Sequence, residues 1–352
     1  MLSCEVVEFS SCNVDFTPHD CRWIPSSARF VVPGSTSKST GRLAVLEATE
    51  DGVDSIAEID CTSGIKCCTF GASPLSERSV TCGNFDGTCV TWDIEMKVPS
   101  KTIPAHSGII HAIDGISIDS AGYGAPELVT GGADGYVKVW DTRQSDAVAT
   151  FRPSSTSACE CWTVAFGNSF SDEERCVLAG YENGDVKLYD LRTGKVRCEM
   201  NVGNGVCSIE FDRRNIRMNK FICSCLESQF SVFDARTQHS REGFASTTHR
   251  TKARTTLWGV RHLPQDREIS AMLLGDGSIE LYRYEYPEHR RVKTPNGEFR
   301  GISGEIKYIG SCEIASQPIN ALDWHSAYRG LAVCTGLDQR VRVLLGTHLK
   351  YD

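Results

Sequence analysis

The chain has 352 residues, a hydrophobic share of 40% and a formal net charge of −8. This is enough for a large apolar core, but the negative charge excludes a general nucleic-acid binder, which needs a basic field to neutralise phosphates. The first residues show no basic stretch followed by an apolar core, and no apolar run is long enough to span a bilayer. We therefore expect a cytoplasmic protein that contacts neither nucleic acid nor membrane.

Seventeen cysteines, an odd number, raise the question of disulfides or a zinc site. Most of them stand inside apolar strand-like runs, and no pair has the spacing Cys-x-x-Cys. The close pairs Cys159/Cys161 and Cys223/Cys225 lack a matching group of Cys or His at ligand spacing. We expect reduced thiols that pack as small hydrophobic groups, with no metal and no cofactor.

Taken in chain order, the sequence repeats one motif. In its clearest copy, 129–143, a strand enters a turn at Asp134 and Gly135, and a second, alternating strand ends at Trp140. Alternation bounded by glycines predicts a β-hairpin. The anchor residues of the copies are Leu46, Trp92, Trp140, Tyr189, Phe233, Tyr282 and Leu344, at steps of 44 to 62 residues. Seven copies at this period predict an all-β chain built from seven similar units.

A further strand-like run precedes each copy, and we expect these runs to be the innermost strands of their units. In chain order they are 20–24, 66–70, 110–114, 162–166, 206–211, 257–261 and 319–324. The last copy ends one strand short of a full unit, while the opening segment 5–9 alternates like a strand. We expect this N-terminal strand, about 4–10, to pair with the seventh unit, which leaves no free sheet edge.

One domain, 1–352, accounts for the whole chain on this reading. The longest departure from the repeat is 287–318, which we place as an insert between units six and seven. Its second half, 305–309, has the pattern of an outer strand.

The repeat resembles the WD-repeat family over essentially the whole chain, which implies a seven-bladed β-propeller closed by the N-terminal strand. In that family a His, a Ser or Thr, the turn Asp and the Trp form a hydrogen-bonded tetrad within a blade. His106, Thr130, Asp134 and Trp140 match all four positions, and no other copy is complete. The resemblance implies a structural tetrad, because it satisfies buried polar groups.

Catalytic motifs are missing: there is no phosphate-binding loop, no GxGxxG, no GxSxG and no HExxH. We expect no catalytic residue and a protein that binds other proteins. In a propeller, the turns from second to third strands and the loops entering the inner strands share one rim. Our candidates for binding on this rim are Lys66, Phe85, His111, Trp162, Tyr181, Glu182 and Trp258. Aromatic side chains are favoured anchors because they bury much area at small entropic cost. The alternative is that the tryptophans fill the channel mouth or pack between blades, and that the charged candidates are solvated.

A second pattern, aromatic-Asp-x-Arg, ends three copies at Arg143, Arg192 and Arg236. In some WD-repeat proteins this motif lies on the face that docks onto the adaptor of cullin-type ubiquitin ligases. The alternative function is therefore that of a ligase substrate receptor. The alternative reading of the arginines is that they form salt bridges at the base of the blades.

A closer resemblance, to the Monad-like group of WD-repeat proteins, is carried by runs outside the repeat positions. Among them are 161–168, 204–207, 237–239, 260–264, 284–287 and 316–319. This resemblance implies a non-enzymatic cytosolic propeller, a monomer within a larger complex. The group works with the RuvB-like ATPase co-chaperone and its prefoldin-like module in the preassembly of axonemal dynein arms. Co-chaperone subunits and dynein heavy chains are therefore the expected partners.

Overall fold

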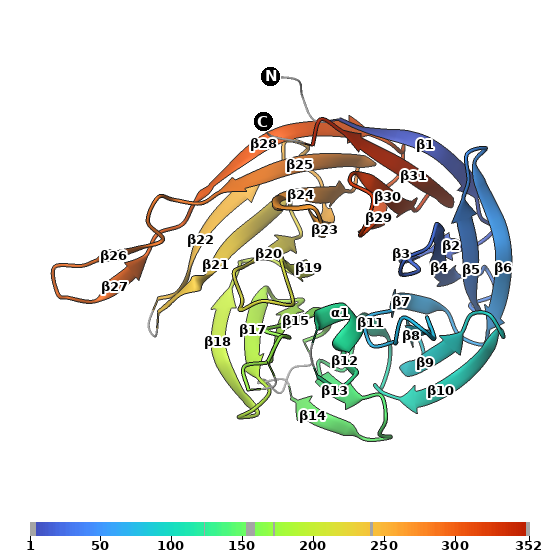
Figure 1. Ribbon diagram of the computed structural model, residues 1–352, viewed down its shortest axis with the longest axis horizontal. Coiled ribbons are helices and arrows are strands. Elements are labelled where there is room, and N and C mark those ends of the chain that lie inside the picture. The colour runs from blue at the N-terminus through green and yellow to red at the C-terminus, as the bar shows by residue number, and fades with distance from the viewer. Residues whose placement is uncertain (1–4, 123, 153–158, 172, 240–241, 350–352) are drawn as a thin grey trace.

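Seven antiparallel sheets stand around a central channel in the computed structural model, which describes residues 5–122, 124–152, 159–171, 173–239 and 242–349 (Figure 1). Each sheet is one blade, and the blades follow one another around the ring in chain order. This confirms the all-β, seven-bladed propeller that the repeat predicts. The one helix in the described part is α1 (Ile118–Ala121), a single turn between β11 and β12.

The strands of blades one to four run from the channel outward. Blade one has β2 (Thr17–Pro18), β3 (Arg22–Trp23), β4 (Arg29–Ser35), β5 (Gly41–Ala48) and β6 (Val53–Cys61). Blade two has β7 (Ile65–Thr69), β8 (Val80–Asn84), β9 (Thr88–Asp93) and β10 (Val98–Pro104). Blade three has β11 (Ile110–Ile116), β12 (Glu127–Gly132), β13 (Val137–Asp141) and β14 (Ala147–Phe151). Blade four has β15 (Cys161–Gly167), β16 (Cys176–Tyr181), β17 (Asp185–Asp190) and β18 (Lys195–Asn201).

The remaining blades follow the same order from the channel outward. Blade five has β19 (Val206–Phe211), β20 (Lys220–Cys225), β21 (Gln229–His239) and β22 (Gly243–Arg250). Blade six has β23 (Leu257–Leu263), β24 (Asp266–Leu274), β25 (Ser278–Glu285) and β28 (Glu305–Glu313). Blade seven has β29 (Ile319–Trp324), β30 (Leu331–Gly336), β31 (Arg340–Thr347) and β1 (Glu5–Asn13).

The apolar core is divided among the junctions between blades. Seven hydrophobic clusters fill the described part of the chain, one between each pair of neighbouring blades. In blade three, Val137 and Val139 pack toward blade four, whereas Trp140 packs toward blade two. The alternating strand can bury both faces because each blade is covered on both sides by its neighbours.

The N-terminal strand closes the ring. β1 pairs antiparallel with β31 as the outer strand of blade seven, from Glu5 opposite Thr347 to Asn13 opposite Arg340. The buried Arg342 side chain lies between Glu8, at 3.1 Å, and Asp338, so an ion pair joins the two chain ends. Residue 4 of the predicted strand lies outside the described residues. The outer edge of the last blade is therefore paired rather than open.

A second set of contacts joins the blades beside the channel. The innermost strands are sheet edges, so their channel-side N–H groups have no partner within their own blade. In four places an acidic side chain of one blade accepts a hydrogen bond from such an N–H in the next blade. The acceptor and donor residues are Asp20 with Cys68, Asp114 with Phe166, Glu210 with His262, and Asp323 with Trp23. The last pair connects blade seven to blade one, so these carboxylates have a structural role.

Two predicted details are wrong. The inner run of blade one, expected over 20–24, is a strand only at β3, and a second short strand, β2, lies before the predicted run. The insert does not lie between blades six and seven, since 305–313 form β28, the outer strand of blade six. The extra residues lie before it and carry the hairpin β26 (Arg291–Lys293) and β27 (Phe299–Gly301), which projects beyond the ring (Figure 1). Spacing alone could not tell on which side of the outer strand the residues were added.

Candidate functional site

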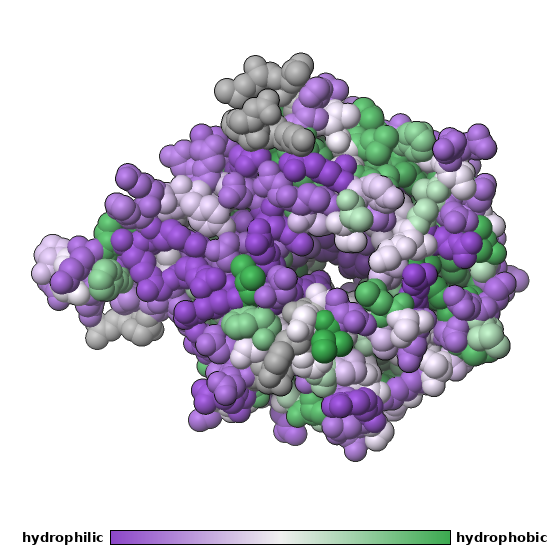
Figure 2. Space-filling view, viewed as in Figure 1, coloured by the Kyte–Doolittle hydropathy of each residue, from purple (hydrophilic) through white to green (hydrophobic). Residues whose placement is uncertain are grey.

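A cavity of about 650 Å³ follows the central channel and brings four of the seven rim candidates together. We call upper rim the side formed by the turns from second to third strands and by the loops that enter the inner strands. Lys66, His111, Trp162 and Trp258 stand at the beginnings of inner strands and line the cavity at this rim. They come from blades two, three, four and six. The channel is open at the centre of the ring in the space-filling view (Figure 2).

The tryptophans divide between the two interpretations that the sequence allows. Trp258 is 41% exposed and presents its indole at the mouth. Trp162 is half-buried and lies across the junction with blade five, where a Cβ on Gly205 would come within 2.6 Å of its ring. Trp258 is thus the more accessible anchor, while Trp162 forms part of the wall.

Glu160 connects the walls of blades three and four, and sequence reasoning missed it. One of its carboxylate oxygens lies 2.9 Å from Nε2 of His111 and accepts the indole N–H of Trp162 at 3.1 Å. Burial lowers the pKa of His111, and the carboxylate opposes part of this effect. Glu160 stands in a loop that enters an inner strand, which is the only signal that could have pointed to it.

Phe85 does not line the cavity, but it packs against a residue that does. Its ring is half-buried and lies 5.3 Å, centroid to centroid, from the ring of His19, which lines the cavity. Nε2 of His19 is 2.8 Å from the hydroxyl of Ser35. Burial, helped by the nearby charge of Lys66, lowers the pKa of His19 to about 4.

We expect His19 to make the stability of the propeller depend on pH between about 6.5 and 4. In this window the unfolded chain binds a proton at His19 that the folded chain does not, so unfolding becomes easier as pH falls. The contribution is fully present above pH 6.5 and is lost as pH falls toward 4. The variant His19→Gln should show a flatter plot of urea midpoint against pH, and an unchanged slope would contradict the assignment.

Tyr181 begins a turn of the upper rim, but its side chain is not accessible for binding there, which corrects the prediction. It is 3% exposed, and its hydroxyl lies 2.7 Å from that of Tyr189. At the matching position of blade three, Gly132 leaves room for the ring of His106, since a Cβ there would lie 2.5 Å from Nδ1. Tyr181 fills the corresponding space in blade four. Its neighbour Glu182 is exposed on the upper rim, as expected for the turn.

The tetrad residues are bonded to one another in blade three. Nδ1 of His106 is 2.8 Å from Oδ1 of Asp134, and Nε2 is 2.8 Å from the hydroxyl of Thr130. The indole N–H of Trp140 donates to the same hydroxyl at 3.0 Å. Burial favours a raised pKa for Asp134, but the bonds from His106 and from backbone N–H groups lower it. The tetrad is buried within the blade and forms no part of the channel mouth.

The three motif arginines lie on the opposite side, the lower rim, formed by the other turns of each blade. Arg143 is exposed and pairs with Asp141 at 2.6 Å, two residues away in its own motif. Arg192 is exposed as well. In blade five, Arg236 donates to the carbonyl of Arg217 at 3.0 Å. Its motif partner Asp234, fully buried, is instead held by Arg290.

Arg290 fixes the base of the hairpin β26–β27 on blade five. Its guanidinium donates to both carboxylate oxygens of Asp234 at 2.6 Å and to the side chain of Asn219 at 2.9 Å. The insert therefore takes over one of the salt bridges that the motif itself was expected to form.

Comparison with known proteins gives the family. The family model described as "WD domain, G-beta repeat" matches residues 97–141, the copy with the complete tetrad. The dynein axonemal assembly factor 10 of Chlamydomonas reinhardtii is 48% identical over 348 residues, which cover 98% of this chain and 97% of that protein. The chain belongs to the dynein axonemal assembly factor 10 family. Its Homo sapiens member is 45% identical over 95% of this chain and 94% of its own length.

More distant members of the dynein axonemal assembly factor 10 family still match from end to end. The protein of that name from Dictyostelium discoideum is 25% identical over 93% of this chain and 91% of its own length. Because these matches cover nearly the whole chain rather than one blade, the shared part includes the loops of both rims.

Three further observations concern metal ligands, thiols and helix length. Within the described ranges, no group of three or more His, Cys, Asp or Glu side chains is placed to hold a metal ion. The sixteen cysteines that the structure describes are free thiols, and eleven of them are buried. Burial raises the pKa of the Cys67 thiol, for example. No helix in the described part is long and apolar enough to cross a membrane.

Proposed function

We propose that this chain is a non-catalytic scaffold that acts in the cytoplasmic preassembly of axonemal dynein arms. The observation that carries the proposal is the match along nearly the whole chain to proteins named dynein axonemal assembly factor 10. The resemblance to the Monad-like group supports the finer statement that the scaffold works with the RuvB-like ATPase co-chaperone and its prefoldin-like module. Dynein heavy chains are the proposed clients, and the propeller is a monomer within the larger complex.

The upper channel mouth is the proposed contact surface. It offers an exposed indole at Trp258, the ammonium group of Lys66 and the carboxylate of Glu182 around the mouth of the channel cavity. Exposed aromatic side chains next to charges are typical of binding hot spots. The mouth brings together no nucleophile with a base at hydrogen-bonding distance among its described residues, so binding without turnover is the function it supports.

Complementation tests this proposal. A Chlamydomonas strain deleted for its own assembly factor 10 should regain dynein arms and motility when it expresses this chain, counted by electron microscopy of axonemes. The double variant Trp162→Ala with Trp258→Ala should restore few arms, because the mouth loses both indoles. Tyr328→Ala, an aromatic side chain 66% exposed on the lower rim, is the matched control and should restore them fully. Normal levels of the wild-type chain without arms would contradict the proposal.

Docking onto a cullin-ligase adaptor remains the alternative function, and the exposure of Arg143 and Arg192 on one rim favours it. Affinity purification from cytosol distinguishes the two functions by the proteins that the chain recovers. RuvB-like ATPases would support the first function, and the cullin adaptor would support the second. Arg143→Ala with Arg192→Ala should abolish recovery of the adaptor. If the wild-type chain recovers no adaptor, the ligase function is excluded.

A further inference from the structure

A second cavity, of about 300 Å³, opens at the lower mouth of the channel between blades five, six and seven. Its wall combines the ends of three inner strands with the loops that leave them. Four arginines line it: Arg213 and Arg214 from blade five, and Arg261 and Arg267 from blade six. This concentration of guanidinium groups is unusual in a chain with a net charge of −8.

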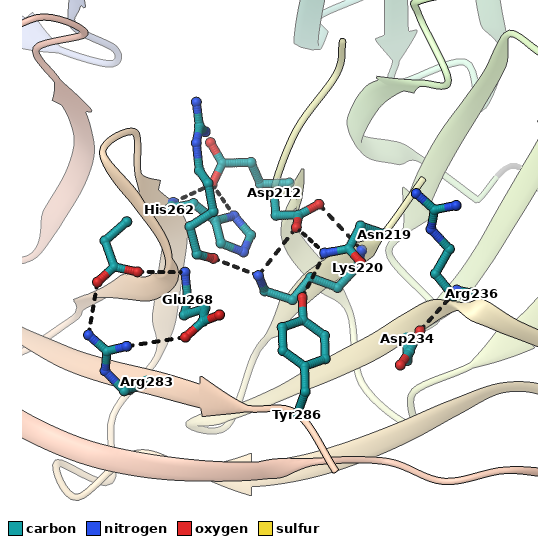
Figure 3. Close-up of polar contacts among 12 residues, drawn as sticks. Asp212, Asn219, Lys220, Asp234, Arg236, His262, Glu268, Arg283 and Tyr286 are labelled. Carbon is teal, nitrogen blue, oxygen red and sulfur yellow. Dashed lines mark hydrogen bonds and ion pairs between the residues drawn. The ribbon is translucent and has the colours of Figure 1, made fainter. Parts of the chain in front are cut away.

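The acidic residues of the same wall are already bonded within the protein. Glu210 accepts hydrogen bonds from the backbone N–H and from Nδ1 of His262. Burial would raise the pKa of Glu210, but these bonds and nearby charges lower it to about 2. Asp212 accepts bonds from Asn219 and Lys220 (Figure 3). Asp323 accepts the N–H of Trp23. The hydrogen bonds described for these three acids therefore come from groups other than the four arginines.

Two buried polar atoms of the wall have no partner among the described residues. One is Nε2 of His262, a side chain 2% exposed, and the other is the indole N–H of Trp324, which is 5% exposed. An indole nitrogen can only donate. Nδ1–H of His262 donates to Glu210, so Nε2 is an acceptor in the neutral ring, and burial lowers the pKa of His262.

Two of the arginines also have unused donors. Within the described chain, the guanidinium groups of Arg213 and Arg267 make no hydrogen bond or ion pair, whereas Arg214 pairs with Asp114 at 2.7 Å. Burial lowers the pKa of Arg267; the negative charges of Glu210 and Asp212 oppose this effect, and the charges of Arg213 and Arg214 add to it. The cavity thus holds an excess of donors over acceptors, which is the reverse of what a cation or an apolar ligand needs.

We propose that this lower cavity binds the phosphate group of a phosphorylated peptide segment. A phosphate dianion offers three strong acceptor oxygens, and planar guanidinium groups bind them in bidentate fashion. It would give partners to the unused guanidinium groups of Arg213 and Arg267, and it would do so more completely than a single carboxylate. The site lies on the face opposite the proposed contact surface and does not depend on it.

The surroundings favour a peptide over a membrane headgroup. On this face hydrophilic side chains gather over blades five and six (Figure 2), and α1 lies at the edge of the channel (Figure 1). Ile118 of α1 is 65% exposed and stands two residues from Ser120, which lines the cavity. It can contact an apolar residue beside the phosphorylated one. A net charge of −8 works against binding to an anionic bilayer.

Nuclear magnetic resonance of the indole N–H groups tests the site on the whole chain. The Trp324→Phe variant identifies the Trp324 resonance by its disappearance. We expect that resonance to shift when inorganic phosphate is added. A short phosphoserine peptide should produce the same shift at a concentration at least ten-fold lower than that of phosphate. The unphosphorylated peptide should produce none. Absence of a shift with both phosphate probes, or equal effect of phosphate and phosphopeptide, would overturn the proposal.

Substitutions provide the second measurement. Arg213→Gln with Arg267→Gln should weaken phosphopeptide binding at least ten-fold by calorimetry, because both unused guanidinium groups are removed. Arg217→Gln is the matched control: it is an exposed arginine of the same loop that does not line the cavity. Circular dichroism shows whether each variant is folded. Equal loss of binding in the control and in the double variant would show general charge attraction and would overturn the site.

Discussion

Replacement of Lys220 by Met should destabilise the propeller by about 3–5 kcal/mol, the usual cost of leaving a buried charge without its partner. Nζ of Lys220 lies 3.3 Å from Asp212, and both side chains are 1% exposed. The ammonium also donates to the carbonyl of Arg267 at 2.6 Å, which ties blade five to blade six (Figure 3). Methionine keeps the volume and removes the charge, so the midpoint of urea unfolding reports the electrostatic loss.

Two controls separate this cost from a general loss of packing. Lys187→Met also removes a buried lysine, but its partner Glu199 is 51% exposed and can be solvated, so the loss should be much smaller. The double variant Lys220→Met with Asp212→Asn should recover most of the stability, because no charge is then buried alone. Equal midpoints for Lys220→Met and Lys187→Met would contradict the explanation.

The blades could be predicted from the sequence because the residues that define each blade lie close together in the chain. Its turn at Asp134 and Gly135, its alternating strand and its anchor Trp140 all lie within one repeat, so the period-2 pattern and the spacing are sufficient to place them. The pairing of β1 with β31 was also predictable, since a ring one strand short needs an outer strand and only the N-terminus was unused.

The sites depend on what the repeat does not encode. Tyr181 was placed wrongly because its burial follows from a missing histidine in its own blade, not from its position in a turn. Glu160 and His19 lie in loops whose shape the repeat leaves open. The lower cavity brings Arg213 together with Arg267 and Trp324, residues that come from three blades. These residues become neighbours only when the ring closes, so their spacing in the sequence does not predict that they meet.

Thr130→Val should cost about 2–6 kcal/mol of stability, because two buried polar groups each lose a partner, at roughly 1–3 kcal/mol for each group left unsatisfied. Thr130 is fully buried, and its hydroxyl lies between the Trp140 indole and Nε2 of His106. The carboxylate of Asp134 can only accept, so Nδ1–H of His106 donates to it, and Nε2 then accepts the hydrogen bond that the Thr130 hydroxyl donates. The same hydroxyl oxygen accepts the indole N–H of Trp140, so one side chain holds both rings.

The matched control is Thr150→Val, an exposed threonine in the outer strand of the same blade, which should change stability by less than about 0.5 kcal/mol. Urea midpoints measure both variants, and hydrogen exchange should show the loss of protection concentrated in β12 and β13. If both variants lower the free energy of unfolding by the same amount, the tetrad does not stabilise blade three. Blade four shows why the effect should stay local: it carries Ala179 at the matching position and joins Tyr181 to Tyr189 instead, so each blade satisfies its buried polar groups by its own means.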